Sequence, residues 1–132
     1  MSSNVFKTLL LLCSPLMLNA WAGDLVVIAS AGVNLTADEV RDVFVGDKQL
    51  VGSLKLTPLD NTSAQEEFLN KVVKVNASKY ASIWVKKGFR EGINPPPLRG
   101  SDAEVILAVK NSVASIGYVS KAPADVKVIL KY

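Results

Sequence analysis

An unbroken apolar run, LVVIA at residues 25–29, lies near the start of the chain and limits the folds open to it. Three of its five residues are β-branched, and such residues favour strands over helices. A strand with no alternation of polar and apolar residues is buried on both of its faces. The run therefore predicts a buried strand over residues 24–30, of the kind found inside a parallel or mixed sheet.

Helix and strand patterns alternate along the rest of the chain. The sequences TADE (36–39) and SDAE (101–104) have the spacing of capping boxes, which mark where helices begin. Apolar residues spaced three and four apart indicate two more helices, and three consecutive prolines make residues 94–97 irregular. The alternation predicts an α/β fold with a mostly parallel sheet flanked by helices. The expected helices are 36–46, 63–74, 76–89 and 101–109; the further expected strands are 54–59, 116–119 and 126–130.

The first 22 residues have the three parts of a secretory signal peptide. Lys7 supplies the positive charge, an apolar stretch follows, and Ala20 and Ala22 give the small residues that precede cleavage. The apolar stretch is too short to span a bilayer well, and Pro15 weakens it further as a membrane helix. We expect residues 1–22 to be removed on export and residues 23–132 to form one domain in the periplasm. No later segment is long and apolar enough for stable membrane insertion.

The composition excludes several kinds of chemistry. The chain has no histidine, and its one cysteine, Cys13, lies in the predicted leader. Residues 23–132 therefore contain neither histidine nor cysteine, and they offer no Ser-His-Asp set, no thiolate nucleophile and few good metal ligands. The net charge of +3 falls to +2 without Lys7, and the remaining lysines are scattered. We therefore expect no enzyme activity, no metal, no cofactor and no binding to nucleic acid.

The segment PLDNTSAQEEF, residues 58–68, joins a predicted strand to a predicted helix. The first N–H groups of a helix and its partial positive charge favour an anion at that point. However, Asp60, Glu66 and Glu67 compete for the same donors, and Ser63 and Glu66 have the spacing of a capping box. Two interpretations stay open: a capped helix without a ligand, or a weak anion site to which Lys55 or Arg99 adds a charge.

The order of these segments resembles the phosphate-type substrate-binding proteins of bacterial ABC transporters, especially their short members of about one lobe. The resemblance covers nearly all of residues 23–132, and its most specific part is IGYV at 116–119 after a helix. It implies a periplasmic-binding-protein-like lobe and an oxyanion ligand. The matching segments are LTADEVRDVFVG (35–46), LTPLD (56–60) with Phe68, Trp84 with Gly88 and Phe89, PPP (95–97), GSDAEV (100–105) and ASIGYV (114–119).

The family's ligand motif is only partly kept. Full-length members carry an Arg, three further residues and Ser-Gly-Thr, often followed by another Arg. The Ser-Gly-Thr positions fall here on Thr62, Ser63 and Ala64, and the two Arg positions are Pro58 and Gln65. The turn at residues 30–32 still offers a hydroxyl and backbone donors where other members contact ligand.

These observations lead to one expected function and one alternative. We expect an exported, phosphate-like oxyanion-binding protein, associated with an ABC transporter, that captures its ligand with Ser30, Gly32, Thr62 and Ser63. The alternative is a ligand-free interaction module that docks onto a membrane sensor, a transporter or a second copy. We expect Tyr80, Trp84 and the Gly117-Tyr118 pair to have structural roles.

Overall fold

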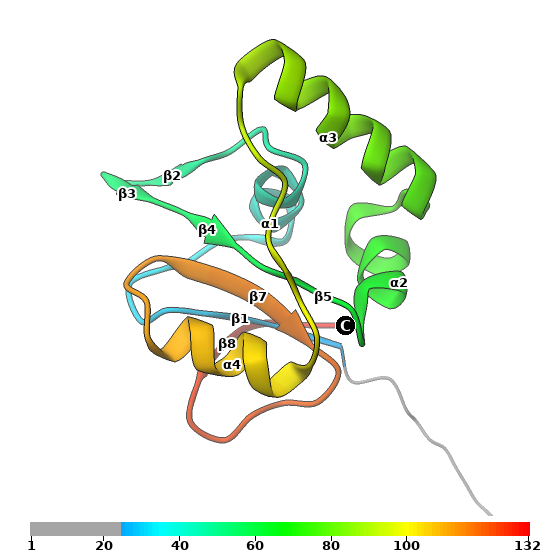
Figure 1. Cartoon of the computed structure of the whole chain (residues 1–132). Helices are drawn as coiled ribbons and strands as arrows, with labels where there is room; N and C mark the ends of the chain where they lie inside the picture. The colour runs from blue at the N-terminus through cyan, green and yellow to red at the C-terminus, as the bar shows by residue number, and fades with distance from the viewer. Residues whose placement is uncertain (1–24) are drawn as a thin grey trace, which may run out of the picture.

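The structure, a computed structural model, describes residues 25–132; the predicted leader lies outside this range. A four-stranded sheet in the order β4-β7-β1-β8 forms its centre (Figure 1). The apolar run at 25–29 supplies β1 (Val26–Ala29). The other three strands are β4 (Thr57–Pro58), β7 (Ser115–Val119) and β8 (Lys127–Lys131).

The sheet is mixed, so the prediction of a mostly parallel sheet is wrong. β1 runs antiparallel to both of its neighbours, β7 and β8, and the β4–β7 pair alone is parallel. The apolar run predicted burial on both faces correctly, but burial does not encode strand direction. Helices cover both faces here, and they bury an antiparallel strand as well as a parallel one.

Alternate residues of β1 enter two separate cores. Val27 and Ala29 face a large core beneath α1, α2 and α3, whereas Val26 and Ile28 face a smaller core beneath α4. Figure 1 shows α4 on one side of the sheet and the other helices on the opposite side. The period of two along a strand explains how one short run supplies both cores.

Three of the four expected helices are confirmed. They are α1 (Ala37–Phe44), α3 (Ala77–Glu91) and α4 (Asp102–Lys110). Thr36 and Glu39 form the predicted capping box. At α4 the hydroxyl of Ser101 accepts a hydrogen bond from the backbone N–H of Glu104, as a cap should, at 3.3 Å. No helix among residues 25–132 combines the length and apolar character needed to cross a bilayer.

The expected helix at 63–74 begins later than predicted. It consists of α2 (Gln65–Phe68) and a π-helical segment (Leu69–Val73), and Ala64 precedes it without a side-chain cap. Ser63 donates its hydroxyl to the side-chain oxygen of Asn61 at 2.7 Å. The same oxygen accepts the backbone N–H of Ser63, which closes a tight turn before the helix. The predicted capping box between Ser63 and Glu66 is therefore wrong.

The expected strand at 54–59 is divided between two pairings, and a third begins directly after it. β3 (Leu54–Lys55) forms a hairpin with β2 (Leu50–Val51), and Thr57 and Pro58 join the main sheet as β4. β5 (Asp60–Asn61) then pairs in parallel with β6 (Leu98–Arg99). This last pairing ties the proline-containing segment to the body of the protein.

Gly117 lets α4 approach the sheet closely. A Cβ built on Gly117 would lie 2.5 Å from Cγ1 of Val105, closer than carbon atoms approach without a shift of the structure. Tyr118, the next residue, is fully buried on the opposite face. Both observations support the structural role expected for this pair.

Candidate functional site

The main candidate site is a cleft of about 650 Å³ between α3 and residues 93–98. Its walls are mostly apolar and aromatic, and its polar residues are Asp60, Gln65 and Asn94. A volume of this size, with few polar groups, is typical of sites for small organic molecules. The main apolar wall residues are Tyr80, Trp84, Val85, Phe89, Pro95 and Leu98.

Helix α3 and the residues after it form the two walls. Asn76 caps the start of α3 by accepting a hydrogen bond from the backbone N–H of Lys79 at 2.8 Å. Gly92 ends the helix in the left-handed conformation, with φ of 67°, which favours glycine. The chain then turns back, and its prolines hold it extended until the carbonyl of Pro97 accepts the N–H of Asp60.

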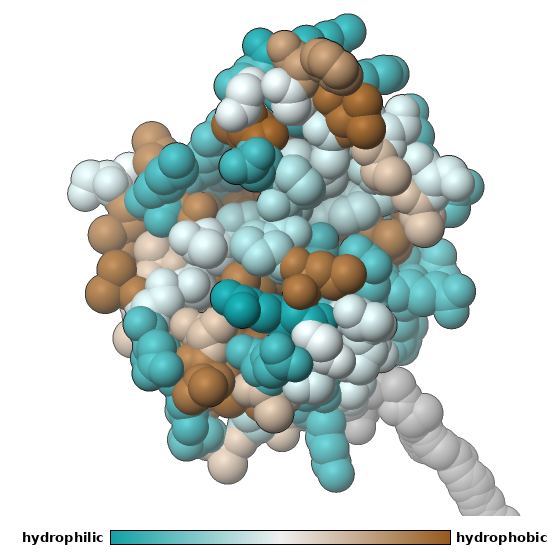
Figure 2. Space-filling view, viewed as in Figure 1, coloured by the Kyte–Doolittle hydropathy of each residue, from teal (hydrophilic) through white to brown (hydrophobic). Residues whose placement is uncertain are grey.

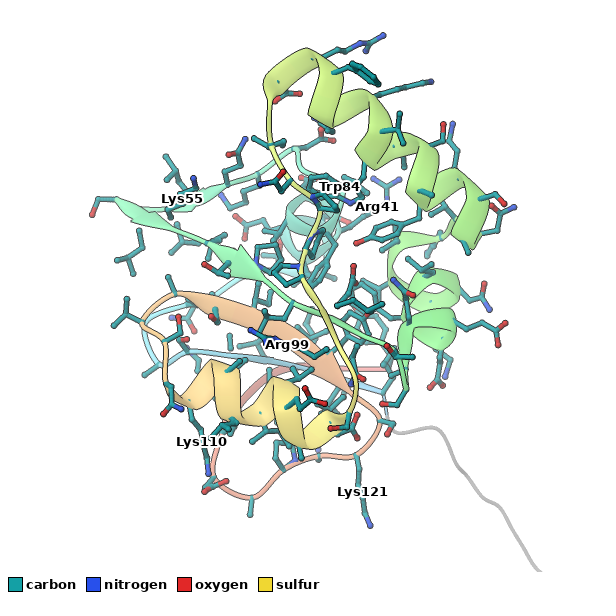
Figure 3. All side chains as sticks on the ribbon, viewed as in Figure 1. Arg41, Lys55, Trp84, Arg99, Lys110 and Lys121 are labelled. Carbon is teal, nitrogen blue, oxygen red and sulfur yellow. The ribbon has the colours of Figure 1, made fainter. Side chains whose placement is uncertain are left out.

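Tyr80 and Trp84 lie one helical turn apart on α3 and join the large core to the cleft. Both are buried, which confirms their predicted place in the core. The indole N–H of Trp84 donates to the carbonyl of Phe44 at 3.0 Å, so the ring has a fixed orientation. Figure 3 shows Trp84 beneath α3, on the side that faces the body of the protein. This hydrogen bond therefore holds the Trp84 ring in place in the inner wall of the cleft.

Asp60 lies at the base of the cleft and is only 3% exposed. Its two carboxylate oxygens accept hydrogen bonds from the hydroxyls of Tyr118, at 2.7 Å, and Tyr80, at 2.8 Å. Tyr118 is itself held by the backbone N–H of Asn61 and by stacking on Phe68, with ring centroids 3.8 Å apart. Burial raises the pKa of Asp60 to about 6, although the two tyrosine hydroxyls partly oppose this shift.

The charge of Asp60 has no counterion among residues 25–132. The ion pairs of this range all involve other carboxylates. Figure 3 shows Lys110 and Lys121 at the α4 end of the molecule and Lys55 on the β2–β3 hairpin. Burial also raises the pKa values of Tyr80 and Tyr118, and the charge of Asp60 adds to the effect, so both stay neutral hydroxyl donors.

A second polar cluster surrounds Asp102 at the start of α4. The carboxylate of Asp102 accepts hydrogen bonds from the side chains of Asn61, Ser63 and Ser120 and from the backbone N–H of Ser120, at 2.7–3.1 Å. Burial works to raise the pKa of Asp102, but these donors together lower it. A carboxylate of the chain therefore occupies the donors that an oxyanion would need.

The structure does not bring the four predicted ligand residues together. Ser30 follows β1 and is buried; its hydroxyl donates to the carbonyl of Val109 and accepts the N–H of Ser115. Gly32 lies in the exposed turn that follows. This pair is near the first residue of β7.

Thr62 and Ser63 lie at the other end of β7. They follow β5, whose Asn61 bonds to Tyr118 near the last residue of that strand, and both are exposed. The backbone N–H of Thr62 donates to the carbonyl of Arg99, so Arg99 is beside this pair, whereas Lys55 is on the hairpin. None of the four residues lines the α3 cleft.

Sequence reasoning missed Asp60 as a site residue and treated it only as a competing charge. The carboxylate meets Tyr80 and Tyr118 across 20 and 58 residues of chain, and no local spacing reveals such contacts. A polar residue directly after the apolar Leu59 was the one available signal.

Comparisons with known proteins relate the chain to others by fold. A scan against protein-family models gives no match, and a search of curated proteins gives none. Among solved structures, the chain is similar to an ABC-type phosphate transport receptor from Vibrio cholerae, with a TM-score of 0.52 and 13% sequence identity. The similarity covers 81% of this chain and 45% of the receptor, so the chain spans less than half of the receptor's length. The expected relation to phosphate-type binding proteins is confirmed at the level of fold.

Proposed function

We propose that the protein is an exported, non-enzymatic solute-binding module, and that the α3 cleft is its ligand site. The observation that carries this proposal is a cleft of suitable volume, with one buried carboxylate at its base, in a fold similar to that of a transport receptor. The predicted leader supports a periplasmic location, and transfer of the solute to an ABC transporter is the role that such a fold would serve.

A pair of substitutions on α3 tests the cleft directly. Ala81 is exposed on the cleft wall, so Ala81→Phe places a ring in the cleft, whereas Ser82→Phe adds the same ring outside the lining. We expect at least one class among phosphate, sulfate, amino acids, amines and short carboxylates to raise the melting temperature of the wild type. Ala81→Phe should abolish that shift and Ser82→Phe should keep it; a shift that survives Ala81→Phe would place the site elsewhere.

A phosphate-like oxyanion remains the finer proposal for the ligand, at Thr62 and Ser63. The likeness to a phosphate receptor and the position of Arg99 beside Thr62 support it. Asp102 opposes it, because its carboxylate lies 3.1 Å from the Ser63 hydroxyl, which also donates to Asn61, and repels a second anion. The cleft is therefore the better supported site.

We expect any phosphate binding at Thr62 to be weak and sensitive to salt. Asp102→Asn should strengthen it by about tenfold, because one negative charge is removed from a partly desolvated site. Arg99→Gln should abolish it, because the donors left are neutral. Calorimetric titration at low salt, with sulfate as the control anion, measures both effects; the absence of heat in Asp102→Asn would contradict an oxyanion site.

The interaction module stays a second candidate because of one observation. Phe89, Val85 and Leu98, on the rim of the cleft, are 89%, 58% and 57% exposed, and Figure 2 shows apolar surface over α3 and near the middle of this face. Exposed apolar side chains that gather on one face can mark a docking site for another protein. Light scattering of wild type against Phe89→Ser tests whether that partner is a second copy.

A further inference from the structure

We propose that the α3 cleft selects a small organic cation, an ammonium or guanidinium group on an apolar body, with Asp60 as its counterion. The inference rests on the proposed function in one respect only, because it takes the α3 cleft as the ligand site. It departs from the oxyanion expected from the fold, since the charge at the base of this cleft is negative.

Within the part of the chain that the structure describes, Asp60 lacks the cationic partner that a buried carboxylate usually has. Buried carboxylates are normally paired with a cation or protonated. Asp60 is nearly fully buried and has only two neutral phenols as partners among the described residues. An ionised carboxylate has about four acceptor positions, and the two tyrosines use two of them. The carboxylate therefore has both the charge and the free acceptor positions to bind a cationic donor.

The walls of the cleft suit a cation that carries an apolar body. Trp84 and Tyr80 line the cleft with buried aromatic rings, Phe89 lies exposed at its rim, and aromatic rings attract cations as well as apolar groups. Gln65 and Asn94 add neutral polar groups, and no lysine or arginine is among the lining residues. An apolar body would cover the aliphatic walls while the cationic end reached Asp60. An anion placed in the same cleft would meet a buried negative charge.

Asp60 changes its ionisation state close to neutral pH. Its pKa of about 6 leaves it mostly ionised at pH 7.5 and mostly protonated at pH 5. The titratable groups that face it are Tyr80 from α3 and Tyr118 from β7, and both remain neutral over this range. The neighbouring residues of α2 and β6 on the cleft, Gln65 and Leu98, carry no charge. Binding of a cation should therefore weaken as the pH falls through about 6.

Three molecules of nearly the same shape test the proposal by calorimetric titration at pH 7.5: 2-phenylethylammonium, 2-phenylethanol and phenylacetate. We expect the ammonium ion to bind about 10- to 100-fold more tightly than the alcohol, the size of one charge-assisted hydrogen bond. Phenylacetate should bind least. Asp60→Asn should bring the ammonium ion and the alcohol to similar affinities, and Ala81→Phe, but not Ser82→Phe, should abolish binding of both.

A second measurement covers the case in which Asp60→Asn does not fold. The same ammonium titration on the wild type at pH 5 should show at least a fivefold loss of affinity, because Asp60 is then about nine-tenths protonated, while affinity for the alcohol should not change. The ammonium ligand stays charged between pH 5 and 7.5, so a loss of affinity reflects a change of ionisation in the protein. A short peptide with a single lysine gives a further arm; tighter binding of that peptide than of the free amine would overturn a solute in favour of a partner's side chain.

The outcomes separate the inference from the function on which it rests. The proposal of a cationic ligand would be overturned if the wild type bound the ammonium ion and the alcohol equally well, or if its affinity for the ammonium ion did not depend on pH. Either result would still leave the cleft as a ligand site. Binding of all three molecules that is insensitive to Ala81→Phe, or no binding of any of them together with no stabilisation by the solute panel, would overturn both.

Discussion

Gly117→Val should destabilise the protein strongly, because it forces a side chain into the contact between β7 and α4. The Cβ alone would lie 2.5 Å from Cγ1 of Val105, and Leu59 is a further neighbour at 3.7 Å. Both lie in the core between β7 and α4, where side chains have no room to move aside. Inserting carbon atoms into a packed core typically costs about 1–3 kcal/mol and sometimes more. For Gly117→Val we expect a loss of free energy of unfolding at or above the upper end of that range. Urea unfolding of the variant and the wild type measures this loss.

Two further variants show whether the cause is this contact. Gly117→Ala should cost less than Gly117→Val, and adding Val105→Ala should recover part of that cost, because the two sites share one contact. Gly32→Ala is the matched control, since its Cβ would have no neighbour closer than 3.9 Å. A Gly117→Val protein that unfolds at the wild-type urea concentration would contradict the close approach of α4 to β7.

Asp60→Asn should make the protein more stable at pH 7.5 and leave it unchanged at low pH. Burial raises the pKa of Asp60 from 3.8 to about 6, a difference worth roughly 3 kcal/mol between its two protonation states. The folded chain binds this proton more tightly than the unfolded chain. Protonated Asp60 therefore makes its whole contribution to the free energy of unfolding below about pH 4. That contribution is lost as the pH rises through 6 and the folded protein has to bury a charged carboxylate. Asparagine avoids that loss, so we expect a gain of about 1–3 kcal/mol at pH 7.5.

The measurement is the free energy of unfolding of both proteins between pH 3.5 and 7.5. Taking the difference between them cancels the other carboxylates, several of which have lowered pKa values. Asp102→Asn is the matched control: its pKa is lowered, so this variant should lose stability at neutral pH and approach the wild type in acid. An Asp60→Asn protein that is less stable than wild type at pH 7.5 would contradict a net cost of the Asp60 charge and show that its partners, the two tyrosine hydroxyls included, compensate that charge.

The sequence predicted local structure well, because the signals for it are local. The run at 25–29 and the capping box of Thr36 and Glu39 both depend on residues within a few positions of each other. Strand direction was wrong because it depends on which distant segments lie beside β1. The predicted start of α2 was wrong because Ser63 does not cap the helix. Its backbone N–H and its hydroxyl both donate to the side-chain oxygen of Asn61, two residues earlier.

The candidate site was harder to predict, because its contacts are long-range. Ser30 has a suitable hydroxyl and a suitable turn, but Val109 and Ser115, 79 and 85 residues away, bind that hydroxyl. The charge of Asp102 reaches Ser63 across 39 residues. Residue types suggested which groups can bind a ligand, whereas the fold decides which of them are already bound to each other.

The position of β1 also affects the order in which the protein can fold. The first strand lies between the last two, β7 and β8, and the N–H of Tyr132 donates to the carbonyl of Leu25. A growing polypeptide therefore cannot complete its central sheet until residues 127–131 have left the ribosome. Contacts between such distant segments form slowly, because a long loop must close first. Such a delay would keep the newly made chain unfolded for longer, which is the state in which a chain can be threaded through a narrow channel.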